Sequence, residues 1–305
     1  MAWSEHKLHR WLAQRPRPKG LRTPLGHDAA QMRSNPDAVL CVDACVEGVH
    51  FERDTPAARV GHKAAARALS DLAACGALPT GLLLGLRAPK DTTPRRLQAM
   101  IAALDQLGQK NGAPLVGGDL CCAPGPLGLT VTAIGHLQPG CKPVTRGGGR
   151  GGDLLLITGP VGGSRAGRHL RFEPRLDAGR LLVRSGVRAL MDVSDGLALD
   201  CDRLARQSQV ALELNLDTLP VHKDAQRAAK RDGITALSHA LNDGEDHELI
   251  ALLPRSKRSL LEPGELLAGM HVIGQARKQT PVGLILCQGE SRQAWSGKGG
   301  WQHGT

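Results

Sequence analysis

Aromatic side chains are nearly absent from the sequence. Its 305 residues include no tyrosine, two phenylalanines and four tryptophans. A core must therefore be built from Leu, Ala, Val and Ile, and a nucleic-acid surface made of successive stacking rings is disfavoured. Basic residues exceed acidic ones by 39 to 29, which gives a net charge of +10 but no polybasic tract. Such a charge suits anionic partners, and we expect phosphorylated small molecules and no nucleic acid.

Membrane spans, a secretion signal and a disulfide framework are also missing. No apolar run approaches the roughly 18 residues of a membrane span, and residues 1–20 lack the apolar centre of about 7–15 residues that a signal peptide needs. The eight cysteines are scattered, and none of their spacings is that of a zinc site. We therefore expect reduced thiols and a cytoplasmic protein.

Common catalytic and nucleotide-binding motifs are absent as well. The sequence has no G-x-x-x-x-G-K-[ST], no H-E-x-x-H and no G-x-S-x-G. A G-x-G-x-x-G pattern occurs at Gly147, Gly149 and Gly152, but it precedes a strand-like run, whereas the dinucleotide fingerprint follows a strand and opens a helix. We interpret this stretch as a linker whose backbone can also approach an anion.

The sequence does contain an irregular alternation of strand-like and helical segments. Apolar runs predict strands at 38–43, 81–86, 127–137, 153–159, 189–193, 210–216, 247–253 and 282–287, and helical patterns occupy 61–77, 93–112 and 196–208. Five of the eight residues from 145 to 152 are glycine. This break predicts an N-terminal domain at 1–148 and a C-terminal domain at 149–305, in a mixed α/β and α+β fold.

Six aspartates stand at or beside apolar elements, a pattern that indicates metal-assisted chemistry. They are Asp28, Asp43, Asp71, Asp119, Asp192 and Asp195. One such residue is usually a helix cap or a turn residue, but six carboxylates that converge repel each other unless cations neutralise them. Hard oxygen ligands without His or Cys pairs favour Mg²⁺ over Zn²⁺. The set therefore predicts several magnesium ions and phosphoryl transfer from ATP.

The same residues lie in motifs that resemble those of a known enzyme family. "VDACVEGVHF", "KAAARALSDLAACGALP", "LVGGDL", "TAIGHL", "TRGGGRGGDLLLITGPVGGSRAG", "MDVSDGLALDCDRLA", "NDGEDHEL" and "GWQH" are similar, in order and spacing, to thiamine-monophosphate kinases. "SDLAACGA" is shared with aminoimidazole ribonucleotide synthetase, selenophosphate synthetase and a hydrogenase maturation enzyme. The other blocks, "VEGVHF", "VSDGL" with "DGEDHEL", and "GWQH", are specific to the kinases.

The resemblance implies a fold, an activity and a set of site residues. The fold is the two-domain one of aminoimidazole ribonucleotide synthetase: an N-terminal domain that binds ATP and Mg²⁺ and forms a homodimer through its sheet, and a C-terminal α+β domain that closes over the substrates. The activity is direct in-line phosphorylation of thiamine monophosphate to thiamine diphosphate, with no general base. By motif, the six aspartates would bind Mg²⁺, Gly118, Asp119, Arg146 and Ser194 would contact ATP, and His50, Glu245 and Trp301 would contact thiamine monophosphate.

The chain departs from the family pattern at several positions. His27 replaces the first acid of a "GDD" motif, and Cys41 with Val42 replaces a Ser-Thr pair before Asp43. Asp243 and His247 alter the usual "GGEDYEL". The lost hydroxyls help to coordinate metal in the family, so we expect a magnesium ion near Asp43 to be held more loosely, by backbone carbonyl or water.

Other functions stay open at this point. A catalytically degenerate paralogue, another ATP-dependent member of the superfamily and a basic nucleic-acid-binding protein are the alternatives. A selenophosphate-type enzyme needs a reactive Cys in a glycine-rich N-terminal segment, but no Cys precedes Cys41, and a hydrogenase maturation enzyme ends in Cys, whereas this chain ends "GWQHGT". Taken alone, His50 reads as a buried strand-end histidine, Arg146 as a solvated charge and Trp301 as a packing anchor.

Overall fold

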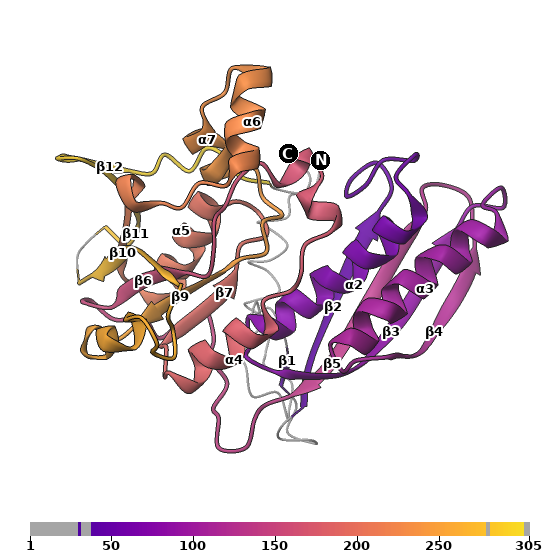
Figure 1. The fold of residues 1–305 in the computed structure, drawn as a ribbon, viewed down its shortest axis with the longest axis horizontal. Helices are drawn as coiled ribbons and strands as arrows, with labels where there is room; N and C mark the ends of the chain where they lie inside the picture. Colours follow the sequence, from indigo (N-terminus) through magenta and orange to yellow (C-terminus); the bar gives the residue numbers. More distant parts are fainter. Residues whose placement is uncertain (1–29, 32–37, 279–280, 302–305) are drawn as a thin grey trace.

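The computed structural model describes residues 30–31, 38–278 and 281–301. The first part of the chain forms a five-stranded sheet in the order β1-β2-β5-β3-β4. Its strands are β1 (Ala30–Gln31), β2 (Ala38–Val46), β3 (Leu78–Ala88), β4 (Leu115–Cys122) and β5 (Gly128–His136). Only the β3–β4 pair is parallel. Two helices, α2 (Ala57–Ala73) and α3 (Pro94–Lys110), run side by side across one face of this sheet (Figure 1).

The small residues of α2 allow it to pack closely on its neighbours. Ala64, Ala65 and Ala68 are buried, and a Cβ atom at Gly61 would lie 1.9 Å from the carbonyl oxygen of Met100 in α3. Alanine also has the highest helix propensity, so the same residues favour the helix and its close packing. This rigid helix supplies several side chains of the site described below.

The face of the five-stranded sheet opposite α2 and α3 carries exposed apolar side chains. Val42 is 63% exposed, Val116 of β4 is 61% exposed and Leu83 of β3 is 37% exposed. Large contiguous apolar patches on a soluble chain usually mark an interface.

The rest of the chain forms a seven-stranded sheet in the order β12-β11-β8-β10-β6-β9-β7. Its strands are β6 (Leu154–Ile157), β7 (Ala189–Asp192), β8 (Ala211–Asn215), β9 (Leu249–Leu253), β10 (His271–Arg277), β11 (Gly283–Gln288) and β12 (Ser291–Ala294). The helices of this part are α4 (Leu176–Arg184), α5 (Leu197–Ser208), α6 (Lys223–Asp232) and α7 (Ala236–Asn242), and its 3-10 turns are η1 (Ser164–Ala166), η2 (Arg168–Leu170), η3 (Leu216–Thr218) and η4 (Arg255–Leu261).

The centre of the seven-stranded sheet is buried on both faces, and one face joins the two parts of the molecule. Leu155 and Ile157 pack in one apolar cluster with α5, whereas Leu154 and Leu156 belong to the cluster that also contains α2 and α4. This is the alternation expected of a strand covered on both sides. Helix α4 crosses α2 so closely that a Cβ atom at Gly179 would lie 2.0 Å from the carbonyl oxygen of Ala73.

The mixed α/β and α+β fold predicted from the sequence is confirmed. A strand lies at each of the eight predicted positions and a helix at each of the three. The sequence analysis missed β1, β4, β10, β12, α4, α6 and α7. The predicted domain boundary at 148 falls between β5 and β6, and it stays a prediction. None of the helices in the described ranges has the length and apolar character to cross a membrane.

Candidate active site

Most of the predicted site residues line one cavity between the two parts of the molecule. The cavity has a volume of about 220 Å³. Nine predicted residues line it: Asp43, His50, Asp71, Arg146, Asp192, Ser194, Asp195, Glu245 and Trp301. Residues from both sheets and from the C-terminal tail therefore converge on one space, although they are separated by up to 258 positions in sequence (301 minus 43).

Two predicted residues of the described ranges, Gly118 and Asp119, do not line this cavity, and a third, Asp28, lies outside those ranges. His27 and Asp28 lie outside the described residues, so the role of Asp28 as a metal ligand stays a prediction. Gly118 and Asp119 are exposed on the edge strand β4, and neither lines the cavity. Gly118 packs against β3, where a Cβ atom would lie 2.1 Å from the carbonyl oxygen of Leu84.

The segment that follows β7 places Ser194 and Asp195 in the cavity. The backbone pairs with the loop before β9: His247 N donates to Val193 O at 2.8 Å, and Glu245 N donates to Ser194 O at 2.6 Å. Both Glu245 and His247 have a positive φ of 51°. Non-glycine residues adopt this conformation infrequently, and it is often found at functional sites. The unusual backbone conformation therefore occurs in the segment that pairs with Val193 and Ser194, where Glu245 lines the cavity.

Asp200 of α5 fixes the turn from Ser194 to Asp195. Its Oδ2 accepts hydrogen bonds from both backbone N–H groups, at 3.0 and 2.9 Å. Burial and the neighbouring Asp195 raise the pKa of Asp200 to about 7. Arg203 forms ion pairs with Asp195 and Asp200. Asp200 is therefore a structural acid that orients the predicted ligands, a role that its position in "SDGLALD" did not reveal.

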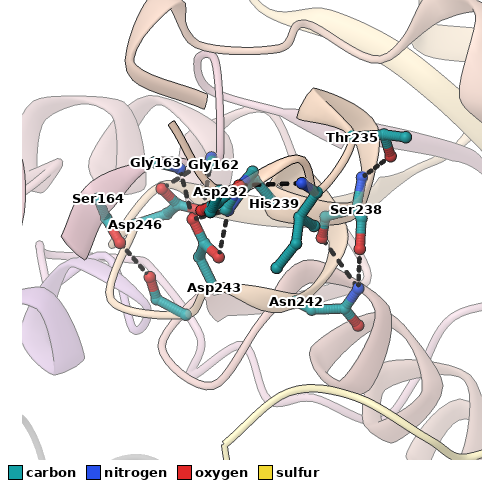
Figure 2. A network of polar contacts seen from close by, with 12 residues as sticks. Gly162, Gly163, Ser164, Asp232, Thr235, Ser238, His239, Asn242, Asp243 and Asp246 are labelled. Atoms are coloured by element: carbon teal, nitrogen blue, oxygen red, sulfur yellow. Dashed lines mark hydrogen bonds and ion pairs between the residues drawn. The ribbon is translucent and has the colours of Figure 1, made fainter. Parts of the chain in front are cut away.

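A second set of hydrogen bonds fastens the loop at 243–246 to the loop before η1 (Figure 2). Gly163 N donates to Asp243 Oδ2 at 2.8 Å, and Gly162 N donates to both oxygens of Asp246. His239 of α7 lies 2.9 Å from Asp243 Oδ1 on the other side. Asp243, one of the departures from the family pattern, thus has a hydrogen-bond partner on each side. These bonds hold the loop that carries Glu245 in place.

Asp71 and Asp192 are two acids of the cavity whose charges interact. Ser70 Oγ donates to Asp192 Oδ2 at 2.7 Å, and His247 Nδ1 lies 3.1 Å from the same oxygen. Burial raises the pKa of Asp192, but these partners and Arg146 bring it below its usual value. Burial and the charge of Asp192 raise the pKa of Asp71 well above its usual range. One acid of the pair is therefore satisfied by its hydrogen-bond partners, whereas for the other the positive charge of Arg67 does not offset burial and the charge of Asp192.

Two basic residues of α2 also reach this region, and the sequence analysis did not single them out. Lys63 is fully buried, and its Nζ lies 2.6 Å from Glu245 Oε1, 2.7 Å from His169 Nδ1 and close to His50 O. Burial lowers the pKa of Lys63, and the negative charge of Glu245 partly offsets this effect. Burial alone would raise the pKa of Glu245, but His169, Lys63 and Arg67 hold it below its usual range. The spacing of Lys63, Arg67 and Asp71 at i, i+4 and i+8 was the available signal, because it places all three on one helix face.

Trp301 closes one side of the cavity. The backbone N–H of Trp301 donates to the carbonyl oxygen of Asp195 at 2.7 Å. Gly300 packs so tightly that a Cβ atom there would lie 2.8 Å from the same oxygen. The guanidinium of Arg165 lies 5.7 Å from the centre of the indole ring, within the range of a cation–π contact. The ring can therefore carry a cation on its face.

Magnesium fits one side of this cavity better than the other. In the ranges that the structure describes, no three His, Cys, Asp or Glu side chains are grouped closely enough to hold a metal ion. Mg²⁺ nevertheless usually binds through one or two carboxylates, together with waters and substrate phosphates. Asp71 and Asp192 meet this requirement, since their charges repel and the nearby charge of Arg67 does not bring the pKa of Asp71 back to its usual range. Asp43, by contrast, is already paired with Arg67.

Comparison with known proteins defines first the class and then the family. Residues 26–137 match the family model "AIR synthase related protein, N-terminal domain", a range that contains β1 to β5 with α2 and α3. The chain is 38% identical to the thiamine-monophosphate kinase of Rhodopirellula baltica over 77% of this chain and 73% of that protein. It is 36% identical to that of Synechococcus elongatus over 92% and 91% of the two chains.

The solved structures agree with the sequence relatives. The structure of AaThiL complexed with AMPPCP and TMP matches with a TM-score of 0.85 and 26% identity, over 98% of this chain and 97% of that one. The chain belongs to the thiamine-monophosphate kinase family. The family resemblance stated from the sequence motifs is thereby confirmed.

Proposed function

We propose that this protein transfers the γ-phosphoryl group of ATP to the phosphate of thiamine monophosphate, giving ADP and thiamine diphosphate. The observation that carries the proposal is the convergence of nine motif residues on one cavity in a chain whose relatives are thiamine-monophosphate kinases. The AaThiL structure, which is similar over nearly its whole length, contains an ATP analogue and TMP.

The attacking group needs no general base. It is an oxygen of the thiamine monophosphate, and a phosphate monoester with a second pKa of about 6 is largely ionised at neutral pH. The new bond forms between this oxygen and the γ-phosphorus, while the bond from the γ-phosphorus to the bridging oxygen of ADP breaks. The difficulty is the mutual repulsion of two polyanions, so the task of the protein is to neutralise charge and to align the groups.

We assign the ATP phosphates to the side of the cavity formed by Arg146 and Ser194. Arg146 lies among the negative charges of Asp200, Asp192 and Asp195, and burial lowers its pKa, but a guanidinium remains charged at neutral pH. Mg²⁺, for which Asp71, Asp192 and Asp195 would be the protein ligands, would supply further charge neutralisation on the phosphates. Asp28, which lies outside the described residues, stays a candidate ligand.

We assign thiamine monophosphate to the side formed by His50, Glu245 and Trp301. Trp301 already faces the Arg165 guanidinium, and a thiazolium cation would make the same kind of contact with the ring. Glu245 carries a negative charge that Lys63, Arg67 and His169 hold in place. Burial and the charge of Arg67 lower the pKa of His50 to about 4, so His50 is neutral at pH 7 and acts as a hydrogen-bonding group.

The proposed activity predicts a specific product and a metal requirement. Purified protein incubated with ATP and thiamine monophosphate should give thiamine diphosphate and ADP in equal amounts, and only when Mg²⁺ or a similar hard cation is present. Mass spectrometry of the products, with and without EDTA, measures both. ADP without thiamine diphosphate would indicate another acceptor. If neither product forms, the degenerate paralogue becomes the better description.

We further propose that the protein is a homodimer formed through the uncovered face of the five-stranded sheet. Val42, Leu83 and Val116 are exposed apolar residues of this face, and Gly118 and Asp119 lie on the edge strand of the sheet, outside the cavity of their own chain. A second copy on this face would bury the apolar side chains and bring new residues to the rim of the cavity beside Val42. Sedimentation should give twice the chain mass of 32.3 kDa, and a Val116→Asp variant should give the single mass. A wild-type monomer would contradict the proposal.

A further inference from the structure

Arg67 places a positive charge among the carboxylates of the cavity, at a position where a metal ion could otherwise bind. Its Nε donates to Asp43 Oδ2 at 2.8 Å and its Nη2 donates to Asp43 Oδ1 at 2.9 Å. This is the two-bond fork with which arginine binds a carboxylate most strongly. A third bond, from Nη1, reaches Glu245 Oε1 at 3.1 Å. Both oxygens of Asp43 therefore accept hydrogen bonds from one guanidinium.

The pair is sheltered from water and held by rigid elements. The side chains of Arg67 and Asp43 are 14% and 23% exposed, and the two residues lie on α2 and β2. Arg67 is one turn from Lys63 and one turn from Asp71 on the same face of α2. Because arginine stays protonated at any physiological pH, its charge at Asp43 is permanent.

The residues beside Asp43 also lack the groups that would help to bind a metal. Cys41 is 6% exposed, and its Sγ points to the carbonyl oxygen of Ala68 in α2 at 3.1 Å. Val42, the other residue before Asp43, lines the cavity and has no hydroxyl group. A divalent cation at Asp43 would thus have no neighbouring hydroxyl ligand and would lie next to a guanidinium of the same sign.

We propose that in this protein Arg67 takes the place of a magnesium ion at Asp43, so that Asp43 is an arginine-bound structural acid and not a metal ligand. The side chain supplies one fixed positive charge beside the substrates, where the family pattern has hydroxyl and carboxylate ligands for a cation. The identity of the substrates in this inference rests on the proposed function. The number of bound metal ions does not depend on it. The inference predicts that this chain binds one metal ion fewer at this edge than a chain with free carboxylate and hydroxyl ligands.

The test counts metal ions without turnover. Mn²⁺ is titrated into the full chain in the presence of AMPPCP, and free Mn²⁺ is measured by electron paramagnetic resonance. Asp43→Asn should bind the same number of ions as the wild type, with the same affinity. Arg67→Met with Cys41→Ser and Val42→Thr should gain one ion, or bind its ions at least tenfold more tightly, and the gain should vanish when Asp43→Asn is added. Arg165→Met, which removes another arginine from the same cavity, should change nothing.

Two results would overturn the proposal. One is the loss of an ion in Asp43→Asn in the wild-type background, which is decisive even if the Arg67 variants do not fold. The other is a folded Arg67 variant, checked by its melting curve, that gains neither an ion nor affinity. The product assay described above is independent of this count, so the absence of thiamine diphosphate would contradict the proposed function and not the role of Arg67.

Discussion

Asp71→Asn is expected to reduce turnover by at least about 10²-fold, or about 2.7 kcal/mol of transition-state stabilisation, and to raise the thermal stability of the metal-free protein. The two effects have the same cause. Burial and the charges of Asp192 and Asp43 raise the pKa of Asp71 well above its usual range. A folded-state pKa above the unfolded value of about 3.9 means that stability falls as the pH rises through the interval between the two values. At neutral pH the wild type carries this cost, and the uncharged Asn does not.

The measurement needs two conditions and one control variant. In EDTA at neutral pH the melting temperature of Asp71→Asn should lie above that of the wild type, whereas excess Mg²⁺ should stabilise the wild type more than the variant. Asp54→Asn removes the same charge from an exposed position that does not line the cavity, and it should alter neither turnover nor the response to Mg²⁺. A folded Asp71→Asn with near-normal turnover, or with lower stability in EDTA, would mean that Asp71 does not hold an essential cation.

The sequence predicted the acids of the site better than their partners. Asp71 and Asp192 were identifiable because a carboxylate inside an Ala-rich helix or at the end of an apolar strand needs a chemical reason. Lys63 and Arg67 were not singled out, because a basic residue in a helix is usually solvated. Their spacing from Asp71 indicates a shared helix face but not that Lys63 is fully buried. Their role depends on Glu245, which is 178 residues from Arg67. Only the fold brings these charges together.

The missed elements have a similar explanation. β4 contains two glycines and is exposed along most of its length, so it has no apolar alternation for a pattern to detect. Its order in the sheet comes from pairing with β3. The strand β10 mixes polar and apolar residues because Gln275 and Arg277 bond to Glu213 of the neighbouring β8. Tertiary contacts, and not local preference, define both strands.

Arg146→Ala is expected to lower kcat/KM for ATP by about 10²–10³-fold, the usual effect of removing a donor from charge that develops in the transition state. Arg146 lines the cavity beside Ser194, and its backbone is fixed by the hydrogen bond from Ser208 Oγ to Arg146 O at 3.0 Å. The adjacent Gly147 and Gly149 allow this close approach, because Cβ atoms there would lie 2.9 Å from Gln207 O and 2.2 Å from a methyl group of Leu252. The guanidinium therefore has a rigid base from which to reach a phosphate.

Two further variants separate this role from general damage to the cavity. Arg146→Lys keeps the charge but loses the planar fork, so it should recover part of the activity, and added guanidinium ion should partly rescue Arg146→Ala. Trp301→Ala should show the opposite pattern: a several-fold higher KM for thiamine monophosphate, consistent with the roughly 0.5–2 kcal/mol of a cation–π contact, and little change for ATP. If Arg146→Ala instead raises the KM for both substrates equally and guanidinium has no effect, Arg146 only neutralises Asp192 and Asp200, and the ATP phosphates must lie elsewhere in the cavity.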